Sequence, residues 1–271
     1  MIIRSVGACL AVLFILLTLP LRGWAGLSIS PAYVEIVLDK GRPSGQFLIS
    51  NLGEEEERFR INAAHFTFLK EGGVQRIEAD KNSLAPWITF NPKEFILGPM
   101  KERLIRFVIV PPKNLRTGEY WAAMELESLK TVIQKMKDEE GRNYTIEVIP
   151  SIMIPIFGKW GNIRYRGILK ETKVSLDEKG QSIQVLVENT GEGRLWVEGD
   201  YRIINSSGEE VEKGSIGQGY LLPGLELAFS VPLKSNFPEG NYTVRVQCRS
   251  PQLKKPIGNE IQLMWKPPVK F

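Results

Sequence analysis

The stretch Asn51-Leu52-Gly53 is the first of three short motifs that occur twice, in the same order, along this chain. Each copy has an Asn-x-Gly turn, then a Leu/Pro phrase, then a glycine followed by an aromatic residue. The first copy is Asn51-Leu52-Gly53, Leu97-Gly98-Pro99 and Gly118-Glu119-Tyr120, and the second is Asn189-Thr190-Gly191, Leu221-Leu222-Pro223 and Gly240-Asn241-Tyr242. A repeat of roughly 100 residues has the size of one independent core. The sequence therefore predicts two tandem domains.

Strand signals dominate the rest of the chain. Alternating, β-branched or aromatic runs lie between turn residues at a spacing of about 8–12 residues, and no long helical pattern occurs. This pattern predicts an all-β protein with two tandem immunoglobulin-like β-sandwich domains. In such sandwiches a corner tyrosine bonds back to the chain, and Tyr120 and Tyr242 are the expected corner residues. Trp196 is the expected core tryptophan of the second sandwich.

Residues 1–25 have the order of a secretory signal peptide. Arg4 precedes an apolar core from Ala11 to Leu19, and small residues lead to a cleavage site after Ala25. The alternative is a membrane anchor, because the chain is apolar from Val6 to Leu21, although that stretch is short for a bilayer core. Cleavage would place the mature protein in the periplasm or otherwise outside the cytoplasm.

The glycine-flanked stretch Gly158-Lys159-Trp160-Gly161 predicts the boundary between the domains. We therefore expect residues 26–160 to form the first domain and residues 161–271 to form the second. A charged stretch from Lys130 to Asn143 interrupts the strand pattern of the first domain. It predicts a long connection, either a loop or a helical turn.

The composition excludes some classes of partner. Lys and Arg number 35 against 31 Asp and Glu, and no basic stripe is present, which argues against nucleic acid. After removal of residues 1–25 the chain keeps one cysteine, Cys248, within an alternating strand-like run. We expect it to be a small buried hydrophobic residue.

Residues for catalysis are scarce. His65 is the only histidine and no Gly-x-Ser-x-Gly elbow occurs, so a Ser-His-Asp site would need Ser83 or Ser128 brought to His65 by folding. One histidine and one mature cysteine cannot supply the four ligands of a zinc site. The run Glu54-Glu55-Glu56-Glu57 lacks the spacing of a calcium loop, and a solvated turn is the favoured interpretation. We therefore expect no enzyme activity, metal or cofactor, with a hydrolase built on His65 as the alternative.

Tyr144, Ile146 and Val148 alternate with polar residues directly after the charged connection, at the start of a long apolar run. Pro150 and Pro155 within this run favour an edge strand or a bulge, because proline cannot donate to a ladder. An open apolar edge is suited to β-augmentation, in which the edge pairs with a partner's sheet. The alternative is an interior strand that closes the first sandwich. Tyr144, Ile146 and Val148 are therefore the candidate partner-binding residues.

Several phrases of the first domain, taken in order, resemble one family. The phrases are Leu27-Ser28-Ile29-Ser30-Pro31, Phe47-Leu48-Ile49-Ser50-Asn51, Phe95-Ile96-Leu97-Gly98-Pro99 and Arg103-Leu104-Ile105-Arg106. Together with the long connection and its apolar strand, they resemble the periplasmic pilus-assembly chaperones over residues 27–157. Members of that family are exported, have two immunoglobulin-like domains and carry no catalytic site.

In that family the strand after the long connection is donated to an incomplete pilin subunit. The resemblance thus implies a chaperone for pilus or fimbrium biogenesis, with a pilin-like or other surface-protein subunit as partner and an outer-membrane usher as a further one. The family holds the subunit's terminal carboxylate with a cleft arginine and lysine, but the matching positions here are Tyr33 and Met153. The nearest cations, Lys40, Lys159 and Arg164, do not match those positions. The second interpretation is a structural or adhesive envelope protein without strand donation.

Overall fold

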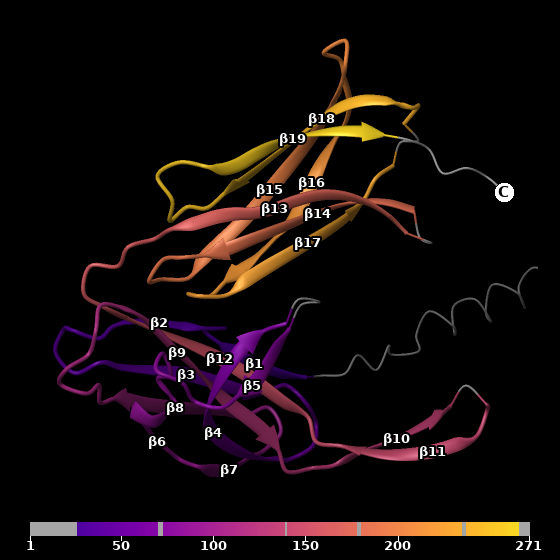
Figure 1. Ribbon diagram of the computed structural model, residues 1–271. Coiled ribbons are helices and arrows are strands. Elements are labelled where there is room, and N and C mark those ends of the chain that lie inside the picture. The colour runs from indigo at the N-terminus through magenta and orange to yellow at the C-terminus, as the bar shows by residue number, and fades with distance from the viewer. Residues whose placement is uncertain (1–25, 70–72, 139, 178–179, 235–236, 266–271) are drawn as a thin grey trace, which may run out of the picture.

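The computed structural model describes residues 26–69, 73–138, 140–177, 180–234 and 237–265. Within these ranges the chain forms strands β1 to β19 and one short 3-10 helix, η1 (Ala85–Trp87). Figure 1 shows two bodies of strands, the first from β1 to β12 and the second from β13 to β19. No helix of the described ranges is long and apolar enough to cross a membrane. The predicted signal peptide, residues 1–25, lies outside them.

Two sheets form the first sandwich, and a two-stranded hairpin extends from it. One sheet has the strand order β1 (Leu27–Ser30), β3 (Ser44–Asn51), β8 (Glu102–Ile109) and β6 (Ile88–Asn91). The other has the order β2 (Val34–Val37), β12 (Ser151–Trp160), β9 (Gly118–Ser128), β4 (Glu57–Phe68) and β5 (Val74–Ile77), with β7 (Glu94–Leu97) paired to β4. The hairpin consists of β10 (Val132–Lys137) and β11 (Asn143–Val148).

The second sandwich has two antiparallel sheets. The smaller has the order β13 (Gly167–Asp177), β14 (Gly180–Asn189) and β17 (Glu226–Pro232). The larger has the order β16 (Glu210–Leu221), β15 (Leu195–Asn205), β18 (Gly240–Arg249) and β19 (Ile257–Trp265). The architecture is therefore all-β with two immunoglobulin-like sandwiches, as the turn spacing predicted.

Each sandwich has its own core, built from the inward side chains of alternating strands. In the first sandwich, Phe47 of β3 and Ile105 of β8 are cross-strand partners and both are buried. Ile203 of β15 and Val244 of β18 have the same relation in the second. Cys248, also on β18, is buried as predicted, and this burial raises the pKa of its thiol to about 11.

Asn51 and Asn189 explain why the first two motifs occur in both halves. The side-chain amide of Asn51 donates to Leu97 O at 3.1 Å, and its Oδ1 accepts from the turn glycine two residues on at 2.9 Å. Asn189 donates to Leu221 O at 2.8 Å and accepts from its own turn glycine at 2.9 Å. Each buried asparagine thus ties the Asn-x-Gly turn to the Leu/Pro phrase of the same sandwich.

The third motif is a tyrosine corner in both sandwiches, as predicted. Tyr120 donates its hydroxyl to Arg116 O at 2.9 Å, and Tyr242 donates to Pro238 O at 3.0 Å. Both bonds reach four residues back along the chain, and both rings are buried in their cores. The hydroxyl fixes the entry of β9 in the first sandwich and of β18 in the second.

Trp196 is not a core residue, and the prediction for it was wrong. Along β15 the side chains of Val197 and Tyr201 are buried, so Trp196 points to the opposite, outer face. There it packs edge to face against Tyr220 of β16, with ring centroids 4.7 Å apart. The side chain therefore contributes to the surface of the larger sheet and not to the core.

The connection from Lys130 to Asn143 also differs from the prediction, because it contains strand β10 in place of a loop or helical turn. β10 pairs antiparallel with β11, from Val132 opposite Val148 to Lys137 opposite Asn143. The long apolar run that follows is divided as well, since β11 ends before Pro150 and β12 begins after it.

A buried ion pair and an apolar cluster join the two sandwiches. Arg194, which precedes β15, contacts Glu119 of β9 and Glu35 of β2. The inter-sandwich cluster consists of the buried residues Phe66, Trp121, Ala123, Phe157 and Leu222, of which Leu222 belongs to the second sandwich. Strand β12 ends at Trp160 and β13 begins at Gly167. The division into separate domains at residue 160 stays a prediction.

Candidate partner-binding edge

The candidate edge is the path of the chain from β11 into β12. Figure 1 shows the β10–β11 hairpin extending outward from the sheet that contains β9 and β12. It prolongs both of these strands, because β10 follows β9 and β11 precedes β12. The candidate residues Tyr144, Ile146 and Val148 all lie on β11.

One side of this path has no strand beside it. β12 pairs with β9 from Ser151 to Trp160, but β2 covers its other side only from Ile156 to Lys159. β11 pairs with β10 alone. Within the described part of the chain, residues 143–155 therefore form an open edge, which is interrupted between β11 and β12 at residues 149–150. Unpaired backbone groups along such an edge are available to another strand.

The candidate residues share one face of the hairpin. Their cross-strand partners on β10 are Met136, Gln134 and Val132, in that order. Tyr144 is 42% exposed, and its hydroxyl faces Met136 Sδ at 3.7 Å. Ile146 and Val148 are half-buried and belong to neither core. The interior-strand alternative therefore does not describe β11, whereas it does describe the end of β12, where Ile154 and Ile156 are buried in the first core.

The opposite face of the hairpin has a different character. Its residues are Ile133, Lys135, Lys137, Asn143, Thr145 and Glu147. The hairpin is therefore amphipathic, with a largely apolar face and a basic and polar face. Sequence reasoning missed Val132 and Met136 as parts of the apolar face, although their period-two spacing was a signal of a strand.

The open edge lacks the charges that usually protect an edge from pairing. Glu147 is the only charged residue from Asn143 to Pro155. Ile149 and Ile152 are exposed on the same stretch. Natural edge strands are commonly guarded by lysine, by inward charges or by proline, and this edge has one acid together with Pro150 and Pro155.

Neither of the two positions that match the chaperone family's cleft arginine and lysine carries a cationic side chain. Tyr33 is exposed just before β2, and Met153 is half-buried against the inter-sandwich cluster. Lys159 pairs with Glu35 at 3.4 Å, and Arg164 pairs with Glu192 at 2.7 Å. Lys159 and Arg164 thus already have carboxylate partners.

His65 does not meet either candidate serine. Its Nδ1 lies 3.2 Å from Trp121 O, and its Nε2 lies 3.0 Å from Asp80 Oδ1. Ser83 and Ser128 use their hydroxyl groups in local turns. A triad is therefore not assembled around His65, and the absence of enzyme activity stays a prediction.

The candidate calcium loop is also engaged. Glu55 pairs with Lys130, and this hydrogen bond lowers the pKa of the Glu55 carboxyl. Across the described ranges no group of three or more His, Cys, Asp or Glu side chains could hold a metal ion.

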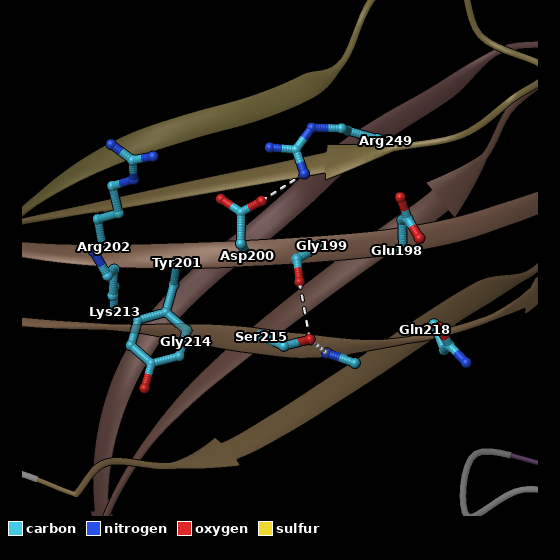
Figure 2. Close-up of a pocket in the computed structure, with 11 residues that line it drawn as sticks. Glu198, Gly199, Asp200, Tyr201, Arg202, Lys213, Gly214, Ser215, Gln218 and Arg249 are labelled. Atoms are coloured by element: carbon cyan, nitrogen blue, oxygen red, sulfur yellow. Dashed lines mark hydrogen bonds and ion pairs between the residues drawn. The ribbon is translucent and has the colours of Figure 1, made fainter.

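A second candidate is a polar groove of about 430 Å³ on the larger sheet of the second sandwich. Figure 2 shows Arg249 pointing to Asp200, an ion pair of 2.6 Å. At the other end, Arg202 and Lys213 both approach Glu210, at 3.8 and 2.9 Å. Because its cations are paired with carboxylates, the groove has no excess of positive or negative charge that would attract a charged ligand. We assign it no function.

No protein-family model matches the chain, and no curated protein matches it. As the sequence resemblance predicted, fimbrial chaperones are among the solved structures to which it is similar. The class 5 fimbriae chaperone CfaA is 14% identical, with 90% of this chain and 100% of that chain covered and a TM-score of 0.46. In the CsuC–CsuE chaperone–tip adhesion subunit complex of Acinetobacter baumannii, the matched chain is 13% identical, with 87% of this chain and 98% of that chain covered and a TM-score of 0.46. In the SafA pilin–SafB chaperone complex of Salmonella enterica, the matched chain is 12% identical, with 87% of this chain and 96% of that chain covered and a TM-score of 0.44.

Proposed function

We propose that this chain is a non-enzymatic, exported, chaperone-like protein that binds a pilin-like or other surface-protein subunit. Binding occurs through the open edge of β11 and β12, which adds a strand to the partner's sheet. The partner is a β-rich subunit that lacks an edge strand, and Tyr144, Ile146 and Val148 enter its groove.

The open edge is the observation that supports this function. A partner strand along residues 143–155 would satisfy backbone groups that have no ladder partner within the described chain. It would extend only to Ile156, because β2 takes over the pairing there. Tyr33 lies at that point, just before β2, so the end of the added strand would meet an aromatic side chain.

The side chains provide the apolar part of the binding energy. Full burial of a large apolar side chain contributes roughly 1.5–3 kcal/mol. Tyr144 is exposed and Ile146 and Val148 are half-buried in the free chain, so each has apolar surface left to bury. Because proline lacks an N–H, Pro155 interrupts the backbone ladder near its end.

The decisive experiment replaces Ile146 and Val148 by Asp and measures capture of a co-expressed pilin-like subunit in the periplasm. We expect capture to be lost, because two charges would enter an apolar groove. The melting temperature of the isolated variant should remain close to that of the parent, since neither residue belongs to a core. Ile133→Asp is the matched control, because Ile133 is 63% exposed on the opposite face of the same hairpin.

Two results would reject strand donation. A large fall in melting temperature without a partner would mean that Ile146 and Val148 stabilise the fold. Equal loss of capture in Ile133→Asp would mean that binding does not depend on the apolar face. Either result would leave a structural or adhesive envelope protein as the better account.

A further inference from the structure

His65, on β4, is held between two acceptor groups in the interior of the first sandwich. Its side chain has no exposed surface. Nδ1 lies 3.2 Å from the carbonyl oxygen of Trp121, and Nε2 lies 3.0 Å from Oδ1 of Asp80. The Nε2 contact is an ion-pair approach rather than a well-aligned hydrogen bond, and Nε2 has no other partner.

The chemistry of imidazole makes this arrangement dependent on a proton. A neutral ring has one N–H and one lone pair, whereas the doubly protonated ring has an N–H at both nitrogens. With a neutral ring, one nitrogen lone pair must face either the Trp121 carbonyl or the Asp80 carboxylate. With the charged ring, both contacts are attractive, and the one to Asp80 becomes an ion pair. Imidazole is the protein side chain whose charge most commonly changes near neutral pH.

The Asp80 carboxylate is part of a loop that runs beside β9 and pairs with it through a parallel bridge between Ser83 and Trp121. Asp80 Oδ1 accepts from Asn82 N at 2.8 Å, and Asn82 O in turn accepts from Trp121 N at 3.0 Å. Leu84 N donates to Trp121 O at 3.0 Å, which is the same carbonyl that His65 approaches. His65 therefore contacts both ends of the attachment between this loop and β9.

We propose that His65 is a proton-dependent latch that holds the loop from Asp80 to Leu84 against β9. The latch is closed when the ring is doubly protonated and loosens when the second proton leaves. Loosening of the latch would also affect residues outside the loop, because Trp121 contacts both His65 and the second sandwich. The Trp121 side chain belongs to the inter-sandwich cluster and donates from Nε1 to Phe66 O at 2.9 Å, so a change at the Trp121 backbone reaches the contact between the sandwiches.

Asp80 is the charged group that faces His65. On β5 the cross-strand partner of His65 is Ile77, which is uncharged. The nearest acids of β9 on the outer face are engaged elsewhere, since Glu119 pairs with Arg194 and Glu125 pairs with the β5 residue Arg76. The contact between His65 and Asp80 is therefore the one expected to respond when His65 changes charge.

Hydrogen exchange of the Trp121 and Leu84 amides, followed by NMR on the full mature chain, tests the latch. After correction for the intrinsic pH dependence of exchange, we expect protection of both amides to fall about tenfold from pH 5.5 to pH 8, as for loss of one hydrogen bond to a charged group. Because the chain has one histidine, the ¹⁵N shifts of a single ring report the proton directly. The ring should be doubly protonated where protection is high.

Asp80→Asn is the matched variant, because an amide can donate to or accept from a neutral ring. We expect its protection to be the same at both pH values. Equal protection of the parent at both pH values would overturn the proposal. So would a fall in protection that is not accompanied by the change in ring protonation, or one that persists unchanged in Asp80→Asn.

Discussion

The guanidinium of Arg194 in the second sandwich donates to the buried carboxylate of Glu119 in the first, with 2.5 Å between Nη1 and Oε1. The Arg194 backbone N–H donates to Oε2 of the same carboxylate at 2.6 Å. The guanidinium also lies over the ring of Phe157, 3.6 Å from its centroid. One residue thus makes an ion pair, a backbone hydrogen bond and a cation–π contact across the junction of the sandwiches.

Replacement of Arg194 by Ala should be strongly destabilising. Removal of one partner of a buried ion pair leaves an uncompensated charge and costs about 3–5 kcal/mol. Urea unfolding followed by tryptophan fluorescence would measure the loss. Arg164→Ala is the control, because the Arg164 side chain is 84% exposed in its pair with Glu192. An exposed pair contributes at most about 1 kcal/mol. Equal losses in the two variants would contradict the assigned role of Arg194.

The same junction should make stability depend on pH. Burial raises the pKa of the Glu119 carboxyl, and the opposing attraction of Arg194 is smaller. A folded-state pKa above the unfolded value means that the native state binds this proton more tightly. The contribution is therefore fully present below the unfolded pKa and is lost as the pH rises through the folded pKa. Urea midpoints measured from acid to neutral pH should show this fall in the parent and not in Glu119→Gln. Parallel curves for the two proteins would refute this sign.

The tyrosine corners should contribute similarly to the two sandwiches. Tyr120→Phe and Tyr242→Phe each remove one hydroxyl bond to a carbonyl, at 2.9 and 3.0 Å, and keep the buried ring. Each change should cost on the order of 1 kcal/mol in the free energy of unfolding. Tyr144→Phe is the control, because its exposed hydroxyl faces only a thioether. Unchanged stability in both corner variants would show that the hydroxyl bonds are exchanged for water without loss.

The sequence predicted what depends on local residue types. The Asn-x-Gly turns and the Leu/Pro phrases recur because Asn51 and Asn189 bond to equivalent carbonyls in the two sandwiches. The corner tyrosines recur because each hydroxyl bonds to a carbonyl four residues back along the chain. Those motifs were sufficient for the all-β class and for two sandwiches. Trp196 was assigned to the wrong face of its sheet, because side chains along β15 alternate between the core and the outer face. Which of the two sets faces the core is decided by the pairing of β15 with β16 and β18.

The candidate edge was predictable only in part. The alternation of Tyr144, Ile146 and Val148 indicated a strand with one apolar face. The charges of Lys135 and Lys137 concealed β10, because they lie on the polar face of a hairpin that is apolar on its other side. That the edge is open follows from the place where β2 joins β12, at Ile156, and this pairing is between segments far apart in sequence.

Export should remove the first residues of the chain. Arg4, the apolar core that follows it and the small residues before Gly26 predict cleavage after Ala25. N-terminal sequencing of the periplasmic or secreted protein should begin at Gly26 or within a residue or two of it. A chain that begins at Met1 and fractionates with membranes would favour the anchor alternative.

Limited trypsin digestion should separate the two sandwiches. The sites expected to be cut first are after Arg142, at the turn of the β10–β11 hairpin, and after Arg164, between β12 and β13, because both side chains are largely exposed and lie outside the cores. Arginines within core strands, such as Arg106 of β8 and Arg245 of β18, should be cut later, since cleavage there requires the sheet to open. Mass spectrometry of the early products identifies the order of the cuts.

Cleavage after Arg164 should give two fragments that each keep a β-type circular dichroism spectrum, because each core is built from its own strands. Early cleavage within β8 or β18, or loss of β structure in both fragments, would show that the two sandwiches do not fold as separate domains divided near residue 160.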